Sequence, residues 1–222
     1  MPAVASVGAE SKGATTAATL AAPAFVAAGD LLVAVLLSDT SSNTFAQPEG
    51  GGWTQLQRSN SSGADALEVW WKIASGSNSY AFVQSAASPW VGIALRVIGH
   101  DPSAPIAASG KSGSAVSVTS LKTASLTTTR SPSLILSIFG EDGDATGLGW
   151  SLAGATELFD FQETVSFCEI AGYSEEKATP GEVSRTAELA AANECNSVIL
   201  AVQPPLADGP RPGSRALLGV GR

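Results

Sequence analysis

The residues that could do acid–base or nucleophilic chemistry are few in this sequence. The single histidine, His100, is followed by Asp101, so a Ser-His-Asp site would have to use this pair. No Gly-x-Ser-x-Gly nucleophile elbow is present, and Pro102 and Pro105 indicate that the segment is a turn. We therefore interpret His100 as a turn residue and not as a catalytic base.

Carboxylates offer a second route to chemistry. A glycoside hydrolase needs two of them beside its substrate, but the separation of two side chains across a sheet cannot be read from a sequence. The candidates for such a pair are Glu68, Glu157, Glu163 and Glu169. Because the spacing selects no pair, we expect no enzymatic activity, and a hydrolase is the least favoured alternative.

The densest acidic cluster could bind a metal ion. Glu141, Asp142 and Asp144 surround a glycine directly after an apolar run, and carboxylates on a tight turn can bind Ca²⁺. Their spacing differs from that of an EF-hand loop, and the chain has too few His and Cys residues at typical spacing for a zinc site. We expect no metal and no cofactor, with these three carboxylates as weak candidates.

Tryptophans could form a platform for sugar rings, because flat apolar ring faces suit that ligand. The five tryptophans are Trp53, Trp70, Trp71, Trp90 and Trp150. Adjacent residues of a strand point to opposite faces, so one of Trp70 and Trp71 should enter the core while the other faces a loop or a partner. Packing in a core or interface is favoured over a ligand platform. Trp71 and Trp53 are the candidates for a ligand or interface role.

Composition narrows the class of protein. The chain has 222 residues, of which 44% are hydrophobic and 14% charged, with a formal net charge of −8. This charge argues against nucleic-acid binding, which needs clustered Lys and Arg. The longest apolar runs fall short of the roughly 20 residues that cross a membrane, and the N-terminus lacks the pattern of a secretion signal. We expect synthesis in the cytoplasm and no membrane partner.

The apolar pattern indicates the elements that must position any site. Residues 80–85 and 116–121 alternate between apolar and polar, as half-buried strands do. Residues 31–37 and 134–139 are continuously apolar and should be central strands buried on both faces. Turn residues recur at strand-length intervals, which favours a sandwich or jelly roll. The alanine-rich segment 186–193 has helix propensity, but its counterpart at residues 82–87 reads as a strand, so we predict a strand there.

The same order of predicted strands occurs twice along the sequence. Residues 31–39 match residues 134–142, and Gly52-Trp53-Thr54 matches Gly154-Ala155-Thr156. Further matches pair Glu68-Val69 with Glu169-Ile170, and residues 90–98 with residues 196–202. We predict one all-β, double-sheet domain over residues 1–203, built from pseudo-repeats of about 1–100 and 101–203. Cys168 and Cys195 would fill positions that the first half gives to Leu67 and Pro89, and we expect both thiols to be free.

Residues 204–222 have a different character. This segment contains three Arg against one Asp, and its Pro and Gly content favours an extended arm. The candidate partner-docking residues are Arg211, Arg215, Leu217, Leu218, Val220 and Arg222. We expect the arm to dock on a neighbour.

Several motifs resemble those of a known kind of domain. They are Gly29-Asp30-Leu31-Leu32, Gly52-Trp53-Thr54, residues 69–74, residues 90–99, Asp101-Pro102 and Pro105-Ile106. Over residues 15–203 the chain resembles the jelly-roll-like β-sandwich domains of virion structural proteins from tailed bacteriophages and some bacterial surface proteins. The resemblance carries no catalytic residues.

The resemblance implies a non-enzymatic structural protein of the virion, most directly a capsid decoration or minor head protein that docks on the shell. Its partners would be the major capsid protein or neighbouring copies, and a homo-oligomer is possible. The alternative is a tail or fibre component that binds a host-surface glycan.

Overall fold

All the regular elements of the described chain are β-strands. The computed structural model describes residues 1–61, 63–75, 78–142, 149–162 and 168–206. The strands are β1 (Ala3–Val7), β2 (Ser11–Gly13), β3 (Ala17–Thr19), β4 (Leu31–Ser38), β5 (Phe45–Ala46), β6 (Thr54–Ser59), β7 (Ala66–Ile73), β8 (Ala81–Gln84), β9 (Trp90–Ile98), β10 (Ile106–Lys122), β11 (Leu126–Thr128), β12 (Ser133–Asp142), β13 (Trp150–Ser151), β14 (Thr156–Gln162), β15 (Cys168–Lys177), β16 (Gly181–Val183) and β17 (Thr186–Val202). The segment 186–193 lies within β17, which confirms its prediction as a strand.

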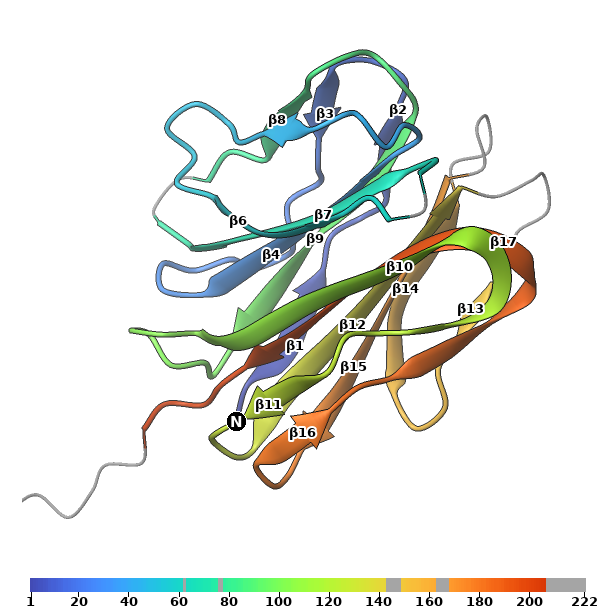
Figure 1. Cartoon of the computed structure of the whole chain (residues 1–222). Coiled ribbons are helices and arrows are strands. Elements are labelled where there is room, and N and C mark those ends of the chain that lie inside the picture. Colours follow the sequence, from blue (N-terminus) through green and yellow to red (C-terminus); the bar gives the residue numbers. More distant parts are fainter. Residues whose placement is uncertain (62, 76–77, 143–148, 163–167, 207–222) are drawn as a thin grey trace, which may run out of the picture.

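Two large antiparallel sheets pack face to face (Figure 1). Sheet one has the order β1-β9-β4-β7-β6, and sheet two has the order β10-β17-β12-β15-β14. Reading the two orders side by side pairs each strand of the first half with one strand of the second: β1 with β10, β9 with β17, β4 with β12, β7 with β15 and β6 with β14. Each half therefore builds one sheet of the same topology, and the prediction of an all-β double-sheet sandwich is confirmed.

The inner core lies between the two sheets and explains the continuously apolar strands. In β4, Leu31, Val33, Val35 and Leu37 point into this core, where they meet residues of β12, β15 and β17. The alternate residues of β4 point outward into a second core. Because β4 and β12 are central strands buried on both faces, their apolar runs do not alternate.

Smaller sheets cover the outer faces of the sandwich. The sheet β3-β8-β5 lies over sheet one, where Phe45 and Phe82 pack on Trp70. The pair β11-β16 lies over sheet two, where Leu126 and Val183 pack on Ile135. Each half is thus a large sheet with its own cover.

The ladders correct one part of the sequence alignment. Leu31 pairs with Val97, and Leu134 pairs with Val202, so these pairs correspond between the halves. Trp90 lies seven residues before Val97, and Cys195 lies seven residues before Val202. Cys195 therefore corresponds to Trp90 and not to Pro89. A one-residue slip reverses the face of every side chain, and Cys195 indeed points away from the inner core.

One side of the sandwich is closed by contacts between the sheet edges β6 and β10. Gln57 Nε2 donates to Ser109 Oγ at 2.9 Å, and Ser59 Oγ donates to the carbonyl of Ser112 at 2.8 Å. Behind this seam lies the fully buried Asn196 of β17, whose Oδ1 lies 2.7 Å from the same Ser59 Oγ, so the two acceptors share one hydroxyl proton. These bonds fix sheet two against sheet one.

Candidate functional site

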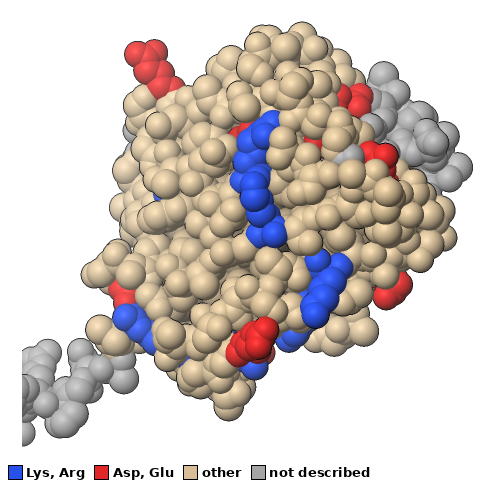
Figure 2. Space-filling model, in the orientation of Figure 1, with Lys and Arg blue, Asp and Glu red and all other residues tan. Residues whose placement is uncertain are grey.

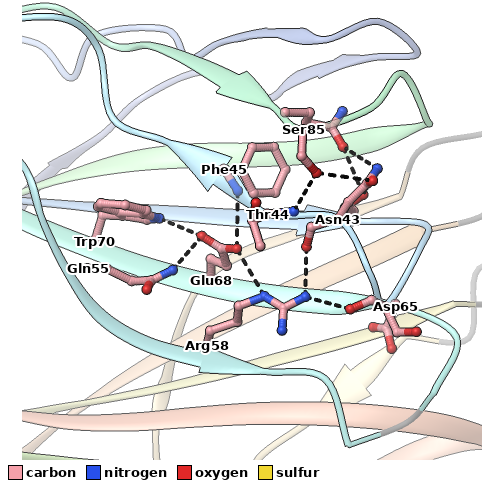
Figure 3. Close-up of polar contacts among 12 residues, drawn as sticks. Asn43, Thr44, Phe45, Gln55, Arg58, Asp65, Glu68, Trp70 and Ser85 are labelled. Carbon is pink, nitrogen blue, oxygen red and sulfur yellow. Dashed lines mark hydrogen bonds and ion pairs between the residues drawn. The ribbon is translucent and has the colours of Figure 1, made fainter.

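The fully buried carboxylate of Glu68 on β7 is the centre of a polar cluster in the first half (Figure 3). Its Oε1 accepts from the backbone N–H of Phe45 and from Arg58 Nε, each at 3.2 Å. Its Oε2 accepts from Gln55 Nε2 at 2.7 Å and from Trp70 Nε1 at 3.0 Å. One carboxylate therefore ties together three strands: β5, β6 and β7.

The alternation of β7 explains why Glu68 is buried. Leu67 and Val69 point into the inner core, so Glu68 and Trp70 point outward beneath the cover that contains β5. Burial raises the pKa of Glu68, although its four hydrogen-bond donors, Arg58 among them, oppose that rise. Since internal donors occupy both oxygens, the arrangement is that of a structural clamp, and the chemistry of a general base would need one of these bonds to open.

The corresponding region of the second half has a different charge pattern. The ladders of both halves carry an irregularity at the same place, between Gln55 and Gln57 and between Glu157 and Phe159. Aligned on it, Arg58 corresponds to Asp160 on β14. Glu68, which pairs with Arg58, then corresponds to Ala171. The sequence repeat instead matches Glu68 with Glu169, two residues away.

Asp160 and Glu169 form a carboxyl pair in the place of the Arg58–Glu68 ion pair. Their side chains lie within hydrogen-bonding reach of each other. Burial raises the pKa of Asp160, and the charge of Glu157 raises it further. The sequence analysis missed Asp160, although one carboxylate between Phe159 and Phe161 in an apolar strand was a usable signal.

Two aromatic residues border this carboxyl pair. Tyr173 Oη donates to the carbonyl of Trp150 at 2.6 Å, and both side chains pack on Phe139. Burial and the charges of Asp160, Glu157 and Glu169 raise the pKa of Tyr173. The cluster can hold a proton between two carboxyl groups.

The three weak candidates for a metal site are only partly covered by the described residues. Glu141 is fully buried, and its Oε2 accepts from Asn193 Nδ2. Among the residues that the structure describes, no three His, Cys, Asp or Glu side chains lie together as a metal site. Asp144 and the side chain of Asp142 lie outside the described residues.

The tryptophans lie in the cores of the sandwich. Trp53 is 3% exposed and packs on Tyr80 and Phe82, so it lacks the exposed face that a sugar platform needs. Trp70 points into the outer core, while Trp71 is partly buried against the inner core. The two rings do point to opposite faces, as predicted, and a partner contact for Trp71 stays a prediction.

His100 occupies the crossover between the halves, as the turn interpretation requires. The ring is buried, with Nε2 3.0 Å from the carbonyl oxygen of Gly29 and Nδ1 3.0 Å from that of Asp101. Asp101 forms an ion pair with Arg130, whose guanidinium also donates to the carbonyl of Pro204 at 3.3 Å. These contacts join the ends of four segments at one end of the sandwich.

Exposed apolar side chains gather at that same end. Of the six large hydrophobic residues that are exposed in the described part of the chain, four lie there: Met1 (64%), Phe25 (89%), Ile98 (39%) and Leu206 (69%). We call this region, defined by these four residues, the arm end, because residues 204–206 leave the sandwich there (Figure 1). The six candidate docking residues of the arm itself lie outside the described residues.

The backbone of Phe25 is held in an unusual conformation at the arm end. Its φ is +58°, a value that bulky residues rarely adopt. Ser6 Oγ donates to the carbonyl of Ala24 at 2.8 Å, and Asp30 Oδ2 accepts from the N–H of Ala27 at 2.7 Å. These bonds fix the loop on both sides of the exposed ring.

A groove of about 290 Å³ opens on the side of the sandwich opposite the β6–β10 seam. It lies between β1 and β14, the edge strands of the two sheets. Its apolar lining comes from Met1, Pro2, Val4, Leu134 and Leu158, and its polar residues include Thr156, Ser174 and Glu176.

The two cysteines form no disulfide and both are buried, as expected. Cys168 points into the inner core and Cys195 into an outer core. Burial and the neighbouring charge of Glu141 raise the pKa of Cys195.

Comparisons with family models, with curated proteins and with solved structures found no match to this chain. The described residues contain no helix that is long and apolar enough to cross a membrane.

Proposed function

We propose that this chain is a non-enzymatic structural protein of a tailed-bacteriophage virion, most directly a capsid decoration or minor head protein that docks on the shell. The observation that carries the proposal is the arm end, because four of the six exposed large apolar residues in the described part of the chain lie at the end of the sandwich from which the arm leaves. Apolar side chains gathered at one end of a sandwich are typical of a protein interface.

The rest of the visible surface suits the same role. Figure 2 shows one face of the molecule, in the orientation of Figure 1. Charged side chains are sparse on this face, so uncharged residues form most of it. Desolvating such a surface costs less than desolvating one rich in charges. On a repeating shell, several weak contacts of this kind add up to stable attachment.

Phe25 is the strongest anchor for such a contact. Its ring is 89% exposed, and its positive φ would favour Asn over an aromatic residue if the ring had no role. A strained, exposed aromatic residue on a fixed loop is therefore the residue whose removal should reveal docking.

The test uses purified full-length protein and virions from which it has been removed. We expect Phe25→Asn to lower rebinding at least tenfold without loss of stability, because Asn tolerates the positive φ. The matched control is Val83→Asn, which removes an exposed apolar side chain from β8, away from the arm end. Rebinding of Phe25→Asn at the wild-type level would refute the proposal, as would absence of the protein from purified virions.

A further inference from the structure

The groove between β1 and β14 breaks the pseudo-symmetry of the sandwich. In the correspondence of the two halves, β1 matches β10 and β14 matches β6. The β6–β10 side is sealed by side-chain bonds, including one from Lys111 Nζ to the carbonyl of Arg58 at 2.6 Å. The equivalent β1–β14 side is open enough to form a groove of about 290 Å³.

The two walls of the groove offer backbone groups as well as apolar surface. Among the described strands, β1 pairs with β9 alone and β14 with β15 alone, so each has one edge without a ladder partner. Such an edge can accept an extended segment by strand addition. Glu176 contributes an exposed carboxylate beside this apolar lining.

The last eight residues of the chain have the matching chemistry. Residues 215–222 read Arg-Ala-Leu-Leu-Gly-Val-Gly-Arg. In an extended segment, Leu218 and Val220 project to the same side and could enter the apolar groove. Arg215 and Arg222 stand at the two ends, where either could pair with Glu176.

The intervening chain is long enough to reach a groove on a neighbouring molecule. Leu134 lines the groove and pairs with Val202, so a chain's own groove begins one strand away from the start of its arm, roughly 5 Å. Residues 207–216, ten residues that include Pro210 and Pro212, would span roughly 30 Å when extended.

We propose that the β1–β14 groove binds residues 215–222 of a second copy of this chain. This deepens the docking role given to the arm under the proposed function, and it names the neighbouring copy as the arm's partner. Arm exchange would link adjacent copies, while the Phe25 side of the arm end contacts the shell.

Mixed cysteine variants of the full-length chain test this inference. One variant carries Thr156→Cys at the exposed edge of the groove, and the other carries Val220→Cys in the arm. The native thiols are buried, so they should contribute little background. Under mild oxidation we expect at least ten times more disulfide-linked dimer from this mixture than from Val83→Cys mixed with Val220→Cys.

Charge reversal adds a second readout that does not depend on cysteine placement. Glu176→Lys on the groove variant should lower the dimer yield severalfold, and Arg215→Glu with Arg222→Glu on the arm variant should restore it. No excess over the Val83 control would overturn the inference. So would cross-linking confined to single chains when one molecule carries both Thr156→Cys and Val220→Cys. These failures would leave the rebinding result for Phe25→Asn unchanged, so the two proposals fail separately.

Discussion

Replacing a buried glutamate by glutamine should have opposite consequences in the two halves of the sandwich. Glu68 accepts four hydrogen bonds, among them those from Arg58 Nε and Trp70 Nε1. In Glu68→Gln, the amide nitrogen cannot accept, so the donors on one side lose their acceptor. Gln55 is exposed and can turn to water, whereas the indole N–H of the buried Trp70 cannot.

The expected cost of Glu68→Gln follows from these contacts. An orphaned buried donor costs about 1–3 kcal/mol, and weakening the bond from Arg58, which is itself partly exposed, adds about 1 kcal/mol. We expect a loss of about 2–4 kcal/mol in the free energy of unfolding at pH 7. For a chain of 222 residues this lowers Tm by about 5–15 °C.

The control is Glu169→Gln in the second half. Glu169 is 2% exposed and lies beside Asp160, so a neutral amide removes one of two neighbouring carboxyl charges from a buried site. We expect this variant to be as stable as the wild type or more stable at pH 7. Urea and thermal unfolding, followed by tryptophan fluorescence, measure both effects. Equal destabilisation by the two substitutions would refute the assignment of a charged clamp to one half and a carboxyl pair to the other.

Three further predictions concern the same scaffold. Burial raises the pKa of Asp160 above its usual 3.8, so the protonated side chain contributes fully to the stability of the fold below pH 3.8. This contribution is lost as the pH rises through the raised pKa. Asp160→Asn should therefore reduce the fall in unfolding free energy between pH 4 and 7, and an unchanged slope in urea titrations would contradict this. Gly113→Ala would place a Cβ 2.7 Å from Asn196 Oδ1 and 2.9 Å from the carbonyl of Cys195, so we expect a loss of about 1–3 kcal/mol, against none for Ser117→Ala on the same strand. Ellman's reagent should label neither buried thiol of the native chain within minutes and both after unfolding, and rapid native labelling would contradict the burial of Cys168 and Cys195.

The sheet architecture could be predicted because it depends on apolar periodicity. The uninterrupted runs of β4 and β12 marked the central strands, and the repeat decided that the alanine-rich start of β17 is a strand. The repeat did not predict which single residues correspond between the two halves. Cys195 was matched with Pro89 and Glu68 with Glu169, because short apolar segments align almost equally well in several registers.

The candidate sites were less accessible to sequence reasoning. The clamp on Glu68 and the pairing of Asp160 with Glu169 depend on which side chains meet across strands, and bulges set that register. The burial of Trp53 likewise depends on β8, whose Phe82 covers it. The exposure of Phe25 and its positive φ are properties of a loop and left no periodic signal.

The orientation of the protein on the assembled virion tests the central claim most directly. A cryo-electron microscopy reconstruction should show the arm end, with Phe25, Ile98 and the start of the arm, in contact with the shell or with neighbouring copies. A map in which the arm end faces solvent and another surface contacts the particle would contradict the account.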